Sequence, residues 1–240
     1  MQAPGAGSPP DAGEQAALPA SVRVAAAEIA LWPARQSIAP LSAPLMAITT
    51  FGDHADYHPV LIAAALAAEN DPRFRGEMFR GACGTKARNV PGWSDSSATL
   101  IHGRALMLAH RTLSKKAVYA DDSWGSIYRA GDYCMPHSHL RSNASIVYML
   151  DPGDEDPGEP LAGKLCFADA RIPACCPHEP GRVTQHLIPT MTPGTMIIFA
   201  SDYLHSVNPY RGRRPRITLS WNITLSRLPG RPGEGWTKPG

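Results

Sequence analysis

The sequence predicts a mainly β protein with flanking helices, folded as a β-sandwich or a jelly-roll barrel. From about residue 117 onward, short runs rich in β-branched and aromatic residues alternate with turns that contain Pro, Gly and Asp. Two stretches with helical character precede these runs. Several short strands that follow two helices are typical of a barrel buttressed by helices. The predicted strands comprise residues 117–119, 123–128, 145–150, 164–167, 183–188, 195–200 and 216–223.

Helical support is predicted between about residues 57 and 114. The first helix begins at His58-Pro59, because proline is tolerated in a first helical turn and residues 60–68 are rich in helix formers. It ends near residue 71, and a loop is predicted for the segment that follows. A second helix is expected from the possible N-caps at 94–97 to about Ser114. A further strand is predicted within 22–32.

The length and composition favour one domain. A chain of 240 residues that is 43% hydrophobic and 18% charged can bury one large core. We assign residues 21–240 to this domain, with the barrel at about 117–225. Residues 1–20 are rich in Ala, Gly, Pro and Gln and lack periodicity. They are therefore predicted to form a disordered tail.

Charge and cysteine content narrow the function classes. The formal net charge of +2 is too small to indicate nucleic acid or an acidic membrane as a partner. No apolar run approaches the roughly 18 residues of a membrane helix, and the N-terminus lacks the features of a signal peptide. Five cysteines without framework spacing favour a reducing compartment. We expect a cytoplasmic protein with a small-molecule substrate. A homodimer is compatible with the sequence, which does not define the oligomeric state.

Three histidines are candidates for a metal site. His137 and His139 precede an apolar run at 146–150. In an extended strand, residues i and i+2 point to the same face, so both imidazoles could reach one metal. His205 follows the predicted strand at 195–200, and a barrel can bring it to the same mouth. Three neutral imidazoles suit iron, copper, zinc or nickel.

An arginine lies eleven residues after the last of these histidines. Arg216 opens the last predicted strand, and a guanidinium that faces into a barrel is costly unless it meets an anion. Thr218 lies on the same strand face and could add a hydroxyl donor. This arrangement fits a site that holds a dicarboxylate co-substrate on iron.

The sequence resembles a known family, the Fe(II)/2-oxoglutarate-dependent oxygenases. The resemblance covers about residues 90 to 225 and is greatest to uncharacterised bacterial and phage members with an HxH pattern. The motifs that carry it are Gly92-Trp-Ser94, Trp124-Gly-Ser-Ile-Tyr128, His137-Ser-His139, Ser145-Ile-Val-Tyr-Met-Leu150, Gly163-Lys-Leu-Cys-Phe, Pro193-Gly-Thr-Met-Ile-Ile-Phe199, Leu204-His205-Ser-Val207 and Arg216-Ile-Thr-Leu-Ser-Trp-Asn222.

The resemblance implies a double-stranded β-helix barrel, of the jelly-roll and cupin-like kind, that binds Fe(II) and 2-oxoglutarate and uses O2. It implies that His137 and His205 ligate iron and that Arg216 with Thr218 binds the co-substrate carboxylate. His139 stands where most of the superfamily has Asp or Glu. We expect it to be the third ligand; the rival interpretation is that it binds substrate while water fills that position.

Other polar residues are weaker candidates. Tyr128 and Ser145 are predicted to contact the co-substrate, and Arg141, Asn143 and Tyr148 are predicted to contact the substrate. The rival interpretation of both tyrosines is a core role with a satisfied hydroxyl.

The function that this resemblance implies is oxidation of a small metabolite, amino-acid-like or a natural-product intermediate, with release of succinate and CO2. Hydroxylation is the default outcome; desaturation, cyclisation and epimerisation start from the same chemistry. Two alternatives remain open. One is a three-histidine, cupin-type dioxygenase that needs no co-substrate, and the other is a non-catalytic barrel that binds a metal or a peptide.

Overall fold

The computed structural model describes residues 18–42, 45–78, 81–115, 117–139, 141–168, 186–226 and 234–237. The predicted tail therefore lies almost wholly outside the described residues. The helices are α1 (His58–Asn70) and α2 (Ser96–Leu113), with short 3-10 turns η1 (His54–Asp56) and η2 (Val90–Gly92). The strands are β1 (Ser21–Val24), β2 (Ala27–Ala30), β3 (Ala39–Ser42), β4 (Met46–Thr50), β5 (Arg75–Gly76), β6 (Thr85–Arg88), β7 (Ala117–Tyr128), β8 (Cys134–His137), β9 (Ala144–Asp151), β10 (Leu165–Ala168), β11 (His186–Leu187), β12 (Thr195–Ala200), β13 (Leu204–Val207), β14 (Arg216–Thr224) and β15 (Glu234–Thr237).

Two antiparallel sheets form the barrel. The large sheet has the order β3-β4-β12-β9-β14-β7-β6-β5, with β15 beside β7, and the small sheet has the order β11-β10-β13-β8. From β7 to β14 the chain passes repeatedly between the two sheets. This is the double-stranded β-helix, and the predicted fold class is confirmed.

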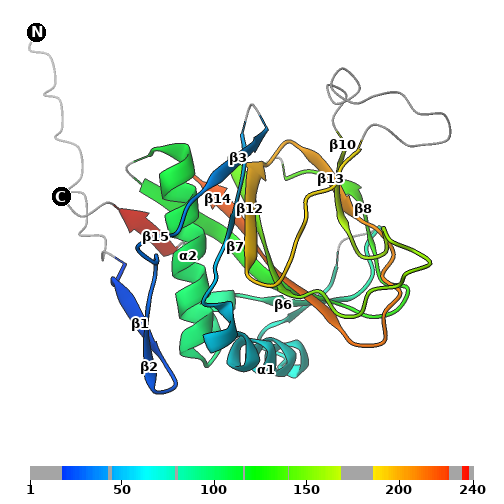
Figure 1. Cartoon of the computed structure of the whole chain (residues 1–240), viewed down its shortest axis with the longest axis horizontal. Helices are drawn as coiled ribbons and strands as arrows, with labels where there is room; N and C mark the ends of the chain where they lie inside the picture. The colour runs from blue at the N-terminus through cyan, green and yellow to red at the C-terminus, as the bar shows by residue number, and fades with distance from the viewer. Residues whose placement is uncertain are drawn as a thin grey trace, which may run out of the picture.

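The two helices cover the face of the large sheet that is turned away from the small sheet (Figure 1). Both were predicted with nearly the observed bounds. Pro59 lies in the first turn of α1, and the Asp95 carboxylate accepts a hydrogen bond from the Ser97 backbone N–H at the start of α2. Ile101 and Leu108 of α2 are fully buried in the main core with α1 and the sheet.

Strand β9 shows how the sheet divides its side chains between two environments. Ile146, Tyr148 and Leu150 belong to the core beneath the helices. Val147 packs in the second core, between the two sheets, and Ser145 lines the cavity there. Alternate residues of a strand point to opposite faces, so β9 contributes to both cores.

Several strand predictions need correction. The runs at 117–119 and 123–128 form one continuous strand, β7, and the expected single strand within 22–32 is the hairpin β1–β2. The predicted loop after α1 contains β5 and β6, which extend the large sheet next to β7. Of the predicted strand at 183–188, only β11 lies within the described residues. No helix in this described part is both long and apolar enough to span a membrane.

Candidate metal and co-substrate site

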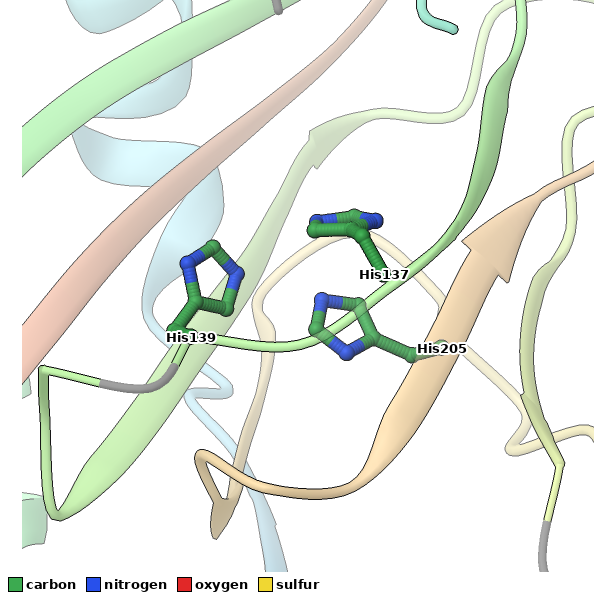
Figure 2. Close-up of side chains that lie close together, drawn as sticks. All are labelled: His137, His139 and His205. Carbon is green, nitrogen blue, oxygen red and sulfur yellow. The ribbon is translucent and has the colours of Figure 1, made fainter.

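The three candidate histidines come together at the small sheet. One ring nitrogen from each of His137, His139 and His205 lies within 4.8 Å of the others. The ring centroids of His137 and His205 are 4.2 Å apart, and Figure 2 shows the third ring beside this pair. The geometry suits one small metal ion held by three imidazoles.

The strands position these rings differently from the expectation. His137 ends β8, and His139 lies in the segment beyond that strand, so the two do not share a strand face. His205 lies within β13 and pairs across the sheet with His137. The site is thus built from one cross-strand pair and one residue of a connecting segment. The backbone N–H of His139 donates to the Ser201 carbonyl, which anchors that segment.

Hydrogen bonds orient two of the three rings. Nδ1 of His137 is 3.0 Å from the Met135 carbonyl, and Nδ1 of His205 is 2.8 Å from the Tyr203 carbonyl. A carbonyl accepts only from a protonated nitrogen, so each ring keeps the lone pair of Nε2 for a metal.

Burial keeps the three imidazoles neutral. Desolvation lowers the pKa of His205 to about 3 and the pKa of His139 to about 4, and it also lowers the pKa of His137. Phe199 contributes to this environment, because its ring centroid is 4.8 Å from that of His205. Neutral imidazole is the form that binds metal, so these residues fit the Fe(II) that the fold implies.

The same histidines line a cavity of about 360 Å³ that also contains Arg216 and Thr218. Arg216 is only 3% exposed, and its Nη1 has no hydrogen-bond partner among the described residues. Its guanidinium carbon lies 5.6 Å from the centroid of the Tyr128 ring. Burial lowers the pKa of Arg216, yet a guanidinium remains charged at neutral pH. The buried unpaired cation favours a carboxylate, as 2-oxoglutarate would supply.

The weaker candidates divide into two groups. Tyr128 and Ser145 line the cavity, as expected for co-substrate contacts, and the Ser145 hydroxyl donates to Asn222 Oδ1. Asn143 instead accepts a hydrogen bond from the Leu225 backbone N–H, and exposed Arg141 is not among the cavity-lining residues.

Tyr148 requires a correction. It belongs to the core beneath the helices, where its hydroxyl bonds with the Tyr57 hydroxyl and with Nε2 of His58. Tyr148 is one residue out of phase with Ser145 and Val147, so its side chain points away from the cavity.

Several further polar or aromatic residues line the cavity and were not proposed as site residues from the sequence, among them Lys86, Trp124, Ser126 and Ser220. Three of these four could have been predicted from the alternation of side chains between the two faces of a strand. Ser220 continues the face of Arg216 and Thr218, and Trp124 and Ser126 continue the face of Tyr128. Lys86 lies on β6, in a segment predicted as a loop, and carried no comparable signal.

Comparison with known proteins agrees with this geometry. A model of the family described as "Putative 2OG-Fe(II) oxygenase" matches residues 122–222. No curated protein sequence matches the chain.

Three solved structures share the fold. A prolyl-4-hydroxylase from Pseudomonas putida is 16% identical, with a TM-score of 0.53 and coverage of 74% of this chain and 92% of that one. EctD from S. alaskensis is 17% identical, with a TM-score of 0.55 and coverage of 80% and 79%. The epimerase SnoN, in complex with Fe3+, alpha ketoglutarate and nogalamycin RO, is 16% identical, with a TM-score of 0.53 and coverage of 85% and 91%.

A double-stranded β-helix with a three-histidine group and a buried arginine fits a non-haem iron site that also binds a dicarboxylate. Residues 122–222 resemble the 2OG-Fe(II) oxygenases, a family that uses Fe(II), 2-oxoglutarate and O2.

Proposed function

We propose that the protein hydroxylates a small metabolite, amino-acid-like or a natural-product intermediate, while 2-oxoglutarate is converted to succinate and CO2. The observation that carries this proposal is the buried guanidinium of Arg216, whose Nη1 has no hydrogen-bond partner among the described residues, in the cavity that holds the histidine group. A buried cation without a partner implies an anionic ligand, and the nearby imidazoles imply a metal that the ligand could share.

Each residue has a distinct role in this proposal. His137, His139 and His205 would hold Fe(II). Arg216 would bind the C5 carboxylate of 2-oxoglutarate through its two-pronged donor group, and Thr218 would add a hydroxyl donor. When bound, Fe(II) with 2-oxoglutarate supplies the O2-dependent oxidation of a substrate C–H bond.

In this proposal, the other residues that line the cavity orient the ligands and exclude water. Leu165, Phe199 and Val207 supply apolar surface to the cavity. An apolar wall strengthens the pairing between Arg216 and a carboxylate, because water competes less for both charges. Tyr128 and Ser145 line the cavity, and in this proposal the Tyr128 hydroxyl would donate a hydrogen bond to the co-substrate, whereas the Ser145 hydroxyl would first have to release Asn222 Oδ1.

Hydroxylation is proposed as the outcome because it requires no further group from the protein. Among the structures that share this fold, one is named a hydroxylase and another an epimerase, so the fold does not select the outcome. The outcome therefore depends on how the substrate is held, and it needs a direct test.

The test is to load the protein with Fe(II) anaerobically, add 2-oxoglutarate and isotope-labelled O2, and measure succinate. Metabolite pools are then searched by mass spectrometry for products that gain one labelled oxygen atom. We expect 2-oxoglutarate-dependent succinate formation and a labelled product. The third imidazole favours one rival, a three-histidine dioxygenase; O2 uptake that is indifferent to 2-oxoglutarate would support that rival and contradict the proposal.

A further inference from the structure

The cavity contains a second cation, largely but not fully buried, that the co-substrate does not require. The Lys86 side chain is 15% exposed and lines the same cavity as the three histidines. Its Nζ lies 3.7 Å from the centroid of the Trp124 ring, and that ring lies 6.0 Å from the ring of His139. The Trp124 ring is therefore near both Lys86 and the candidate metal ligand His139.

The two cations lie on the strands that flank β7 on either side, Arg216 on β14 and Lys86 on β6. Arg216 is adjacent to Tyr128, and Lys86 contacts Trp124, four residues earlier on β7. In the register Arg216 lies beside Tyr128 and Lys86 beside Ser126, so the two cations are offset by two residues along β7 and lie two strand spacings, about 9–10 Å, apart across the sheet. This spacing allows one anion to bind at Arg216 while a second approaches Lys86 beside His139.

The charge of Lys86 is only partly compensated within the protein. Its nearest carboxylate oxygen among the described residues, Oδ2 of Asp122, lies 3.7 Å away, beyond hydrogen-bond distance. The same oxygen is 3.4 Å from Nη1 of Arg88, so it is shared between two cations. Glu77 also lines the cavity, and it is exposed.

Burial destabilises the charged form of this ammonium. Desolvation lowers the pKa of Lys86 to about 8, and Asp122 opposes that shift only in part. Asp122 balances this charge in part, and the ammonium does not extend into bulk solvent. Its position over the Trp124 ring keeps its three donors beside the cavity instead.

We propose that Lys86 determines substrate specificity by binding a carboxylate group of the primary substrate, while Trp124 packs against the adjoining apolar part. The inference rests on the proposed function, which makes this cavity the place where substrate meets the metal. Arg88 also lines the cavity, but its side chain is 48% exposed and it shares Asp122. The one mostly buried ammonium, with neighbouring hydroxyls at Ser126 and Ser220, suits a monoanion better than a phosphate, which usually recruits several cationic or backbone donors.

The cavity also limits the size of the substrate. Its volume of about 360 Å³ is near the lower end for ligand sites and must accommodate 2-oxoglutarate as well. The substrate is therefore a small carboxylic acid, or a larger one that inserts only its acid-bearing end.

The test compares a matched pair of probes, N-acetylglycine and its primary amide N-acetylglycinamide, with inorganic phosphate as a third ligand. Binding is followed by NMR titration of protein loaded anaerobically with Fe(II) and saturated with 2-oxoglutarate, so that Arg216 is already occupied. The variants are Lys86→Met, Lys86→Arg and, as a surface control, Lys164→Met, whose side chain is 43% exposed.

We expect N-acetylglycine to bind at least tenfold more tightly than the amide. Lys86→Met should abolish this preference, Lys86→Arg should retain part of it, and Lys164→Met should leave it unchanged. The affinity for 2-oxoglutarate should be the same in all four proteins. The proposal is overturned by equal binding of acid and amide, by the absence of saturable binding of the acid, by a preference for phosphate, or by a preference that survives in Lys86→Met.

A failure of the proposed function gives a different experimental result from a failure of the Lys86 proposal. If the wild-type protein does not bind 2-oxoglutarate in the presence of Fe(II), the proposed function fails. The comparison of wild type with Lys86→Met and Arg216→Met in the metal-free protein then decides which cation holds the carboxylate probe. If 2-oxoglutarate binds and only the acid preference is missing, the role of Lys86 alone is rejected.

Discussion

His139 is the residue at which the candidate site departs from the usual pattern of two histidines and one carboxylate. Its ring centroid is 5.0 Å from that of His137 and 5.2 Å from that of His205. A neutral imidazole in place of a carboxylate leaves the metal centre with one more positive charge, which should alter its redox potential and metal preference.

Replacement of His139 tests whether it is a ligand. We expect His139→Ala to weaken Fe(II) binding by more than about tenfold, since even the loss of an outer hydrogen-bond partner costs about 10–100-fold in metal affinity. His139→Asp should restore binding, because a carboxylate can fill the same position. The measurement is an anaerobic competition titration against a chelator. Unchanged Fe(II) affinity in His139→Ala would reassign the residue to substrate binding.

The buried histidines also predict how stability depends on pH. Desolvation lowers the pKa of His205 to about 3 and the pKa of His139 and His58 to about 4, against an ordinary value of about 6.5. Below pH 6.5 the unfolded chain takes up protons that the folded chain does not. The stability contributed by these neutral rings is therefore fully present above about pH 6.5 and is lost as the pH falls toward 4.

Urea unfolding of the metal-free protein at a series of pH values checks this prediction. For His205 alone the slope is about 1.4 kcal/mol per pH unit. The variant His205→Gln should show a correspondingly shallower dependence on pH. An identical slope in wild type and His205→Gln would contradict the buried, neutral state of this ring.

At the scale of elements, the sequence predicts long and regular segments well and short ones poorly. The start of α2 was predicted because Asp95 caps it and apolar residues recur at helical spacing. Strands β8 and β13, which carry His137 and His205, have four residues each, too few to show a period. The identities of these ligand candidates were therefore found from motif and spacing, while their placement within strands was not.

The side chain of Tyr148 on β9 also lies where the sequence did not predict it, and its replacement gives a testable prediction. It joins β9 to the start of α1 through Tyr57 and His58, on the side away from the cavity. Tyr148→Phe leaves two buried polar partners without this hydroxyl, so we expect a loss of about 1–3 kcal/mol in the free energy of unfolding. Urea unfolding measures this loss. The affinity for 2-oxoglutarate should stay the same, and a weaker affinity would return Tyr148 to the site.

At the scale of the whole molecule, the candidate ligands connect the two sheets of the barrel. His137 and His205 belong to the small sheet, whereas Arg216 and Thr218 belong to β14 of the large sheet. Metal alone would contact the small-sheet side, and 2-oxoglutarate would extend from the metal to the large sheet. Bound ligands should therefore stabilise the barrel in two separable steps.

Thermal unfolding followed by circular dichroism under anaerobic conditions tests this coupling. A ligand present at 100 times its dissociation constant stabilises the folded state by about 2.7 kcal/mol, which raises Tm by about 5–10 °C in a chain of this size. We expect one increment with Fe(II) and a second with 2-oxoglutarate. Arg216→Met should keep the first and lose the second. A second increment of full size in Arg216→Met would show that the co-substrate binds elsewhere.

The most direct test of the central claim is an anaerobic titration of metal-free protein with Fe(II) and 2-oxoglutarate, following the visible metal-to-ligand charge-transfer band. We predict a band in the wild-type protein and its loss in His137→Ala and His205→Ala. Arg216→Met should form the band only at a co-substrate concentration about 100-fold higher, because it lacks the buried charge pair. If metal is bound by an independent assay and no band forms, the protein is not a 2-oxoglutarate-dependent oxygenase.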